Sequence, residues 1–384
     1  MADEETWQVG VLFSTTGVTA AIETTMLNAT KLAIEELNGA GGVLGKPIVA
    51  SHHNPESSPK KYQEMARQLL RDERVSIIFG CYMSSCRKTV LPEVEAYRGL
   101  LYYPTVYEGF EYSRRCFYTG ASSNQGAIQL ARYLMTHHGR RFLLVGSNYI
   151  FPYEYNRVIT DIVSQSRGKI LDEVYVPIEA GKADFAPVIK QILKLKPDAI
   201  ISTLVGHSIK TFYEAYAAAG LKAETMPIAA ITTSEAEIAL MEPGTAQGHI
   251  TTSPFFETVE GPEAVRFVAA YKDRFGAHAP VTACAEAAYF QLHLYAKALE
   301  IAGTDDPDGI IRAMAGLEID APQGRVKIDA SNHHTELWPR IGRVNAHGKF
   351  DVVWKAPERV KPDPYFVSAS YDEWSADAAT AIRA

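Results

Sequence analysis

The chain has 384 residues, more than a single hydrophobic core usually serves, and this length suits two domains. Hydrophobic residues make up 47% of the chain and charged residues 22%, a globular balance that argues against bulk disorder and fibrous structure. The formal net charge is −7, which argues against direct nucleic acid binding, because phosphate contacts need clustered Lys and Arg.

The N-terminal third alternates strand-like and helix-like segments. Trp7 to Phe13 has apolar residues on alternate positions, which predicts a strand, and apolar residues at helical spacing predict a helix over 22–38 that glycines then end. Val75 to Phe79 is wholly apolar, as is typical of a strand buried on both faces of a parallel sheet. The remaining elements predicted here are strands at 47–52, 100–103 and 116–119 and helices at 59–72 and 85–97.

The same alternation continues to residue 231 and then gives way to two long helices and a β-rich tail. The predicted elements are helices at 124–138, 153–166, 185–195, 208–219, 263–275 and 282–302, and strands at 142–145, 170–176, 199–203, 227–231, 325–328, 341–344 and 350–354. Strands alternating with helices predict open parallel sheets covered on both faces. Because about five βα units fit in each half, we expect an α/β fold of two doubly wound parallel-sheet lobes.

Catalytic signatures are missing from the sequence. We find no G-x-S-x-G elbow, no H-E-x-x-H motif and no phosphate-binding loop. Cys81 follows a predicted strand, where nucleophiles do occur, but its neighbours supply no base, so a packed thiol is the better interpretation. We therefore expect no enzyme, no catalytic residue and no cofactor.

The cysteines and histidines do not predict a metal site. The four cysteines lack zinc spacing and are expected to be buried free thiols, although Cys81 and Cys86 are close enough to pair in an oxidising compartment: Cys81, Cys86, Cys116 and Cys284. Three histidine pairs stand at 52–53, 137–138 and 333–334. Adjacent side chains diverge, so one ion rarely takes both, and we expect surface or loop histidines.

Polar, uncharged residues follow five of the predicted strands. These segments are Ser14–Gly17, Gly80–Ser84, Tyr103–Tyr107, Gly146–Phe151 and Thr232–Ser234. Ligands of open α/β sheets sit beyond the carboxyl ends of the strands. A carboxylate ligand would call for Arg, Lys or a helix N-terminus, whereas hydroxyls and Tyr rings suit a neutral amide. Helix caps and core aromatics explain each segment singly, but their agreement favours a small neutral ligand.

Several stretches in order resemble a known family. They are Phe13–Ala20, Gly41–Val43, Gly80–Ser84, Arg87–Lys88, Tyr103–Thr105, Tyr107–Ser113, Thr232–Glu237, Ala285–Tyr289, Asp320–Gly324 and Asn332–His334. On these residues the chain resembles the type I periplasmic-binding-protein family. Within that family it is most similar to the short-chain amide and urea receptors, including the amide sensor that negatively regulates aliphatic amidase expression.

The resemblance implies a three-crossover hinge between two lobes and a ligand in the cleft. The implied lobes are residues 1–121 plus 254–328 and residues 122–253 plus 329–384. The implied pocket residues are Ser84, Tyr103, Thr105, Tyr149 and Thr232, with Tyr82 close by and with Val106 and Phe151 at two further pocket positions. The amide-sensor pattern has Pro where Val106 stands, Tyr where Phe151 stands and Asp where Asn148 stands. Losing the Tyr hydroxyl at position 151 changes binding by about 0.5–1.5 kcal/mol.

Three functional hypotheses stay open. The first is the amide- or urea-binding component of an ABC uptake system, which would work with a permease in the periplasm. The second is a cytoplasmic amide sensor that holds an RNA-binding antitermination partner, and Cys284-Ala285-Glu286 favours the amide branch. The third is an amide hydrolase. No secretory signal precedes Trp7, so we expect the cytoplasm if the chain is native as given and the periplasm if a signal has been removed; a homo-oligomer is compatible with either.

Overall fold

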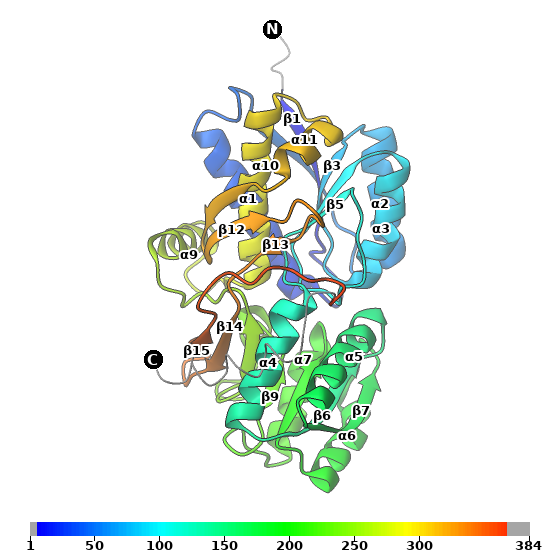
Figure 1. Ribbon diagram of the computed structural model, residues 1–384, viewed down its shortest axis with the longest axis vertical. Coiled ribbons are helices and arrows are strands. Elements are labelled where there is room, and N and C mark those ends of the chain that lie inside the picture. Colours follow the sequence, from blue (N-terminus) through cyan, green and yellow to red (C-terminus); the bar gives the residue numbers. More distant parts are fainter. Residues whose placement is uncertain (1–5, 367–384) are drawn as a thin grey trace.

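The computed structural model describes residues 6–366. These residues form two α/β lobes stacked along the long axis of the molecule, with the first lobe uppermost in Figure 1. The predicted architecture of two parallel-sheet lobes with a three-crossover hinge is confirmed. No helix among the described residues combines the length and the apolar character that a membrane span requires.

The first lobe is built on a five-stranded parallel sheet in the order β2-β1-β3-β4-β5. Its strands are β1 (Trp7–Leu12), β2 (Ile48–His53), β3 (Ile77–Gly80), β4 (Leu100–Tyr103) and β5 (Cys116–Tyr118). One face is covered by α1 (Ala20–Gly39), α10 (Ala283–Ala302) and α11 (Pro307–Met314), and the other by α2 (Pro59–Arg67), the π-helical η1 (Gln68–Asp72) and α3 (Ser84–Ala96). Every residue of β3 is buried, as its wholly apolar sequence predicts.

The second lobe carries a seven-stranded sheet in the order β15-β14-β10-β9-β8-β6-β7. Five strands run parallel: β6 (Arg141–Ser147), β7 (Lys169–Val176), β8 (Ala199–Thr203), β9 (Ile228–Ala230) and β10 (Ile250–Ser253). An antiparallel pair, β14 (Arg340–Val344) and β15 (Phe350–Lys355), extends one edge. The covering helices are α4 (Ser123–His137), α5 (Ile150–Gln165), α6 (Lys182–Leu195) and α7 (His207–Ala218), and the short α8 (Glu235–Ile238) follows β9.

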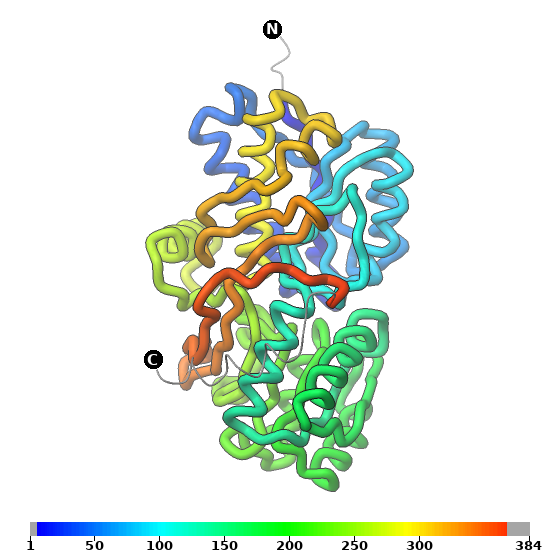
Figure 2. Tube along the Cα trace, in the orientation of Figure 1, coloured from blue at the N-terminus to red at the C-terminus, as the bar shows by residue number. Residues whose placement is uncertain are grey.

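The chain passes between the lobes three times. It crosses after β5 into α4, after β10 into α9 (Pro262–Phe275), and from a small antiparallel sheet into β14. That small sheet consists of β11 (Glu318–Ala321), β12 (Gly324–Ile328) and β13 (Thr335–Glu336). Residues 356–366, red in Figure 2, then run along the boundary between the lobes, where Asn124 of α4 donates to the carbonyl of Lys361 at 2.9 Å and the Phe110 amide donates to the carbonyl of Pro364 at 2.8 Å.

The division into residues 1–121 plus 254–328 and residues 122–253 plus 329–384 stays a prediction. Its ends, 1–5 and 367–384, lie outside the described residues.

Five elements escaped the sequence-based prediction, and their sequences explain why. β10 has only one apolar residue followed by two threonines and a serine, so it shows no strand periodicity. β13 and α8 are two and four residues long, and α11 and β11 lie in a stretch without a clear pattern. The helix predicted over 59–72 changes to π-helical geometry at Gln68, and both Leu69 and Leu70 are buried there.

Candidate ligand-binding cleft

A cavity of about 50 Å³ lies between the two lobes, where the carboxyl ends of both sheets face each other. Its walls include segments that follow β4, β9 and β10 and the N-terminal turns of α1 and α10. Representative lining residues are Ile22, Tyr82, Val106, Thr232, Thr251 and Cys284. This is the position at which open α/β sheets bind ligands.

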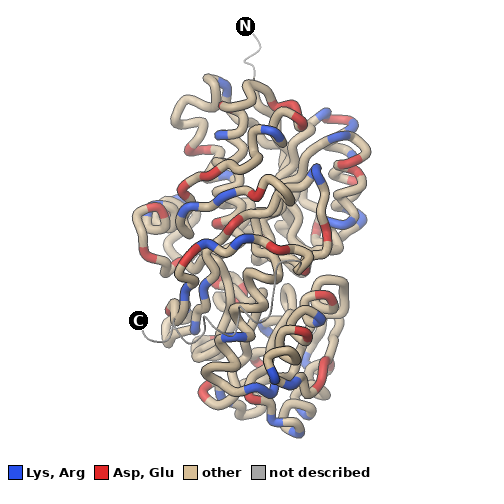
Figure 3. The backbone as a smooth tube through the Cα atoms, viewed as in Figure 1, with Lys and Arg blue, Asp and Glu red and all other residues tan. Residues whose placement is uncertain are grey.

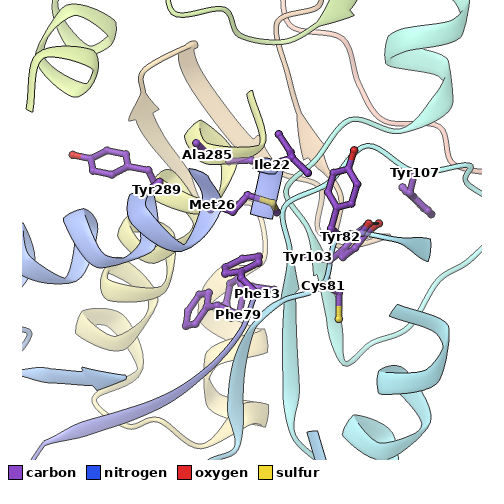
Figure 4. Close-up of a cluster of buried hydrophobic side chains, with 14 of the residues drawn as sticks. Phe13, Ile22, Met26, Phe79, Cys81, Tyr82, Tyr103, Tyr107, Ala285 and Tyr289 are labelled. Carbon is purple, nitrogen blue, oxygen red and sulfur yellow. Dashed lines mark hydrogen bonds between the residues drawn. The ribbon is translucent and has the colours of Figure 1, made fainter. Parts of the chain in front are cut away.

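The predicted pocket residues lie around this cavity to different degrees. Tyr82, Val106 and Thr232 line it. Tyr82 lies beside Tyr103 (Figure 4), whose hydroxyl donates to the carbonyl oxygen of Tyr82 at 2.7 Å. Ser84, the first residue of α3, also lies beside Tyr103, because the guanidinium of Arg87 contacts both side chains.

The two second-lobe aromatics behave differently. Burial raises the pKa of the Tyr149 hydroxyl well above its usual value, and the nearby Tyr103 and Glu108 of the first lobe raise it further. Tyr149 therefore faces the first lobe. Phe151 is buried in the core of the second lobe, with its ring centroid 5.3 Å from that of Tyr155, and is not among the residues that line the cavity. The assignment of all eight residues to a ligand site stays a proposal.

Four of the predicted hydroxyl groups share one property: each donates its hydrogen to an acceptor inside the protein. The bonds run from Ser84 to Glu108 Oε2 (2.5 Å), from Tyr103 to the carbonyl of Tyr82 (2.7 Å), from Thr105 to the carbonyl of Cys81 (3.3 Å) and from Thr232 to the carbonyl of Leu204. A hydroxyl carries one hydrogen and two lone pairs. The oxygens of these four groups can therefore act only as acceptors, and of the four residues Thr232 is among those that line the cavity.

Two other tyrosines have the opposite property. Within residues 6–366, the hydroxyls of Tyr82 and Tyr149 form no hydrogen bond to another residue. Neither hydroxyl oxygen is fully enclosed by the protein. Burial raises the pKa of both hydroxyls well above the usual value, so both keep their proton at neutral pH. Each is free to donate to a ligand.

A buried arginine lies directly behind this group, although the five strand-end segments themselves carry no charged residue. The guanidinium of Arg87 is fully buried, one helical turn after Ser84. It donates to Glu111 at 2.6 Å, to Glu108 at 3.0 Å and to the Ser84 hydroxyl oxygen at 3.2 Å. The rings of Tyr103 and Tyr107 each lie 4.7 Å from the guanidinium carbon.

The charge of this arginine is balanced locally. Lys88 also contacts Glu111, at 2.8 Å, so two cations face two carboxylates. Burial alone would raise the pKa of Glu111, but Arg87 and then Lys88 lower it to about 2. The cluster therefore leaves no free ion for a ligand. Sequence reasoning missed it because the glutamates stand more than twenty positions from Arg87.

Two buried acids of α8 lie on the other side of the cleft. Glu235 lines the cavity, and burial raises its pKa to about 8. Burial likewise raises the pKa of Glu237 to about 7, against the hydrogen bonds that it accepts from Ser234. The pattern Ser234-x-x-Glu237 is a capping box, which is the sequence signal that could have placed a helix here.

The cysteines are free thiols. Cys81, Cys86 and Cys116 are buried and Cys284 is half-buried. The predicted free state is confirmed, and Cys81 and Cys86 are unpaired. Burial raises the pKa of the Cys81 thiol well above its usual value, which opposes nucleophilic chemistry.

The expectation of surface histidines was wrong for one pair. His333 and His334 are buried, and the His334 ring stacks on Tyr118 with centroids 4.2 Å apart. The Tyr107 hydroxyl hydrogen-bonds to Nε2 of His334. Burial lowers the pKa of His334 to about 3, so the ring is neutral. Among the described residues, no group of three or more His, Cys, Asp or Glu side chains is arranged to hold a metal ion.

The lobes contact each other across the cleft. A Cβ atom placed on Gly206, in the second lobe, would lie 2.5 Å from the carbonyl oxygen of Val18 in the first lobe. The guanidinium of Arg157, on α5, lies 4.6 Å from the ring of Phe110 in the loop after β4. The structure therefore represents a closed arrangement.

Charged residues of both signs are interspersed over both lobes in the view of Figure 3. The basic side chains include many that pair with acids, such as Arg67 with Glu93 and Arg274 with Glu35. Such interspersed charges differ from the clustered Lys and Arg of a nucleic-acid-binding face.

Comparison with known proteins places the chain among binding proteins. The sequence profile of a family described as periplasmic binding protein domain matches residues 7–371. Leu/Ile/Val-binding protein homolog 6 of Brucella melitensis is 21% identical over 286 residues, which cover 73% of this chain and 73% of that protein. Limonene hydroxylase of Geobacillus stearothermophilus is 27% identical over 127 residues, but these cover only 33% of this chain and 23% of that protein.

A solved structure shares the fold. The solute-binding protein of an ABC transporter from Rhodopseudomonas palustris BisB5, in complex with 3,4-dihydroxybenzoic acid, superposes with a TM-score of 0.84. It is 21% identical in sequence, and the match covers 93% of this chain and 99% of that chain.

Proposed function

Because the chain belongs to the periplasmic binding protein family, we propose that it is a receptor that closes its two lobes around a small neutral amide or urea and does no chemistry on it. One observation carries the proposal. Four hydroxyl oxygens around the cavity, of which that of Thr232 belongs to its lining, can only accept hydrogen bonds, because their hydrogens point into the protein, while the Tyr82 and Tyr149 hydroxyls are free to donate.

This arrangement matches the hydrogen-bonding groups of an amide. The NH₂ group of an amide or urea donates, and its carbonyl oxygen accepts. Ser84, Tyr103, Thr105 and Thr232 would accept from the NH₂ group, and Tyr82 or Tyr149 would donate to the carbonyl. A carboxylate, by contrast, only accepts, so its oxygens would face lone pairs.

The size of the cavity also favours a small ligand. One water needs roughly 10–15 Å³ of such space, so a cavity of about 50 Å³ holds about three to five water-sized groups. Acetamide and urea have this size, whereas benzoate and leucine are about twice as large.

Ligand binding and lobe closure are coupled in this proposal. Ser84 and Tyr103 belong to the first lobe, and Tyr149 and Thr232 to the second. A ligand that contacts both sets binds the closed form more tightly than the open form, and this difference in affinity shifts the population towards closure.

A receptor for a carboxylate is the second candidate, favoured by the names of similar proteins. One is named for leucine, isoleucine and valine, and one solved structure holds a dihydroxybenzoic acid. Such a ligand would need a free cation or a helix N-terminus at the cleft. Arg87 is engaged by two carboxylates, which leaves the N-terminal turns of α1 and α10 to hold it. An amidase is disfavoured by the raised pKa of Cys81.

The partner follows from where the receptor works. With an ABC permease it would deliver the ligand for uptake in the periplasm, which the likeness to a transporter solute-binding protein supports. With an RNA-binding antitermination regulator it would act as a cytoplasmic amide sensor. Fractionation of cells that express the native gene distinguishes the two.

Calorimetric titration tests the proposed ligand class. We expect heat of binding with at least one of acetamide, propionamide, butyramide, formamide and urea, and none with benzoate or leucine at the same concentration. Ammonia is to be measured in parallel, and we expect none above the buffer control. Tight binding of benzoate or leucine without binding of any amide or urea would contradict the proposal, and steady ammonia release would make the protein an enzyme.

A further inference from the structure

Glu108 lies in the loop after β4 with both carboxylate oxygens engaged. Oε2 accepts from the hydroxyl of Ser84 at 2.5 Å, and Oε1 accepts from Nη2 of Arg87 at 3.0 Å. The side chain is buried, and its backbone carbonyl accepts from the hydroxyl of Ser123, at the start of α4, at 2.9 Å. The carboxylate is therefore held in one orientation.

The hydrogen-bond direction at Ser84 follows from these contacts. The carboxylate is only an acceptor, so the hydroxyl hydrogen must point to Glu108. Nη1 of Arg87 donates to the same hydroxyl oxygen at 3.2 Å. The second lone pair of Ser84 can receive only an N–H or O–H donor.

The charge of Arg87 depends on the same carboxylate. Its guanidinium donates to Glu108, Glu111 and Ser84, and two tyrosine rings lie 4.7 Å from its central carbon. If Glu108 lost its charge, a buried cation would lie 3.2 Å from the Ser84 hydroxyl with a single strong carboxylate partner. A carboxylate ligand beside Ser84 would then be attracted.

We propose that Glu108 is a positioning residue that sets ligand class: it turns the Ser84 hydroxyl into an acceptor and cancels the charge of Arg87, so that the cleft takes N–H donors and rejects carboxylates. This inference rests on the proposed function, because it concerns the same cleft. It adds a cause for selectivity in a residue that does not itself line the cavity.

Glu108→Gln tests this role with almost no change in shape. Arg87 only donates, so the Gln carbonyl oxygen must face Arg87 and the Gln NH₂ group must face Ser84. Ser84 then accepts from the amide and turns its own hydrogen towards the cleft. Acetamide and acetate are the probes, because they have the same shape. We expect acetamide affinity to fall about tenfold and acetate affinity to rise about tenfold, a change of about a hundredfold in their ratio.

Glu93→Gln is the matched control. Glu93 is also a buried acid, and it pairs with Arg67 at 2.6 Å. It belongs to α3 but lies near the opposite end of this helix from Ser84. We expect its acetamide to acetate ratio to equal that of the unchanged protein. A purely structural role of Glu108 would instead lower the affinity for both ligands alike in Glu108→Gln, and that result overturns the inference.

Glu111→Gln separates the two effects and serves if Glu108→Gln does not fold. It removes one carboxylate from Arg87 but leaves the Ser84 to Glu108 bond in place. We expect acetate affinity to rise, with acetamide affinity changed less than about threefold, and an unchanged acetate affinity contradicts the charge argument.

If the unchanged protein binds no amide or urea, the proposed function fails. If it binds them and the acetamide to acetate ratio does not move in either variant, only this inference fails.

Discussion

The hydroxyl and the ring of Tyr103 make different contacts, so their contributions can be tested separately. The hydroxyl donates to the carbonyl of Tyr82, which leaves its lone pairs as acceptors, while the ring packs 4.7 Å from the guanidinium carbon of Arg87. Tyr103→Phe keeps the ring and removes the hydroxyl. We expect amide affinity to fall about five- to tenfold in calorimetry, with the melting temperature lowered by only a few degrees.

The neighbouring Tyr102 offers a matched control for this substitution. It is equally buried, on the same strand, but its hydroxyl has no hydrogen-bond partner among the described residues and belongs to the core of the first lobe. Tyr102→Phe should leave amide affinity unchanged. Equal losses of affinity in both variants would mean that Tyr103 acts through packing alone.

At the residue scale, the chemistry of the cleft was predictable but the direction of its hydrogen bonds was not. The Ser, Thr and Tyr residues stand in the sequence at strand ends, and three of the eight predicted residues line the cavity. Whether Ser84 donates or accepts depends on Glu108, which stands 24 positions away and is joined to it only by the fold. Arg87 was visible in the sequence, but nothing local revealed that it is buried.

Among the short elements, α8 concentrates two acids whose pKa is raised by burial. Burial raises the pKa of Glu235 from 4.5 to about 8 and that of Glu237 to about 7. Between pH 4.5 and these values the folded protein holds protons that the unfolded chain has lost. The free energy of unfolding therefore falls as pH rises through this window, by about 1.4 kcal/mol per pH unit for each acid.

Glu235→Gln removes one of these titrations. We expect its urea-unfolding free energy to vary less between pH 5 and pH 8 than that of the unchanged protein, with the gain in stability largest at pH 8. Glu242→Gln, at an exposed position just after α8, is the control and should keep the original slope. An unchanged slope in Glu235→Gln would show that Glu235 is already ionised in the folded protein.

At the element scale, strands and helices with strong patterns were predictable to within a few residues. β4 and β8 have the predicted bounds, because each is a short apolar run between clear breaks. β10 was missed since its threonines give no apolar pattern, although Thr251 and Thr252 are buried and line the cavity. The cavity wall and the weakest sequence pattern thus coincide in one strand.

For the molecule as a whole, the two lobes approach each other closely at Gly206. This residue has φ 65° and ψ −147°, a conformation that glycine alone adopts readily, and a Cβ atom there would lie 2.5 Å from the Val18 carbonyl oxygen of the other lobe. Gly206→Ala should therefore oppose closure. We expect amide affinity to fall about tenfold or more and the ligand-induced decrease in radius of gyration, measured by small-angle X-ray scattering, to shrink.

Gly220→Ala controls for backbone strain. Gly220 also has a positive φ, 74°, but a Cβ atom there would meet nothing within 4 Å. Both substitutions should lower the melting temperature, and only Gly206→Ala should alter affinity. If the two variants bind the ligand equally well, the contact with Val18 does not limit closure.

The late position of α10 in the chain has a consequence for synthesis on the ribosome. The five strands of the first sheet are complete at Tyr118, yet Tyr295 of α10 is the residue that packs edge-on against Phe79 and Tyr102. All five parallel strands of the second sheet are translated in between. A nascent chain therefore carries the first sheet with one apolar face covered only by α1 until residues 283–302 emerge, and it needs protection from aggregation throughout that interval.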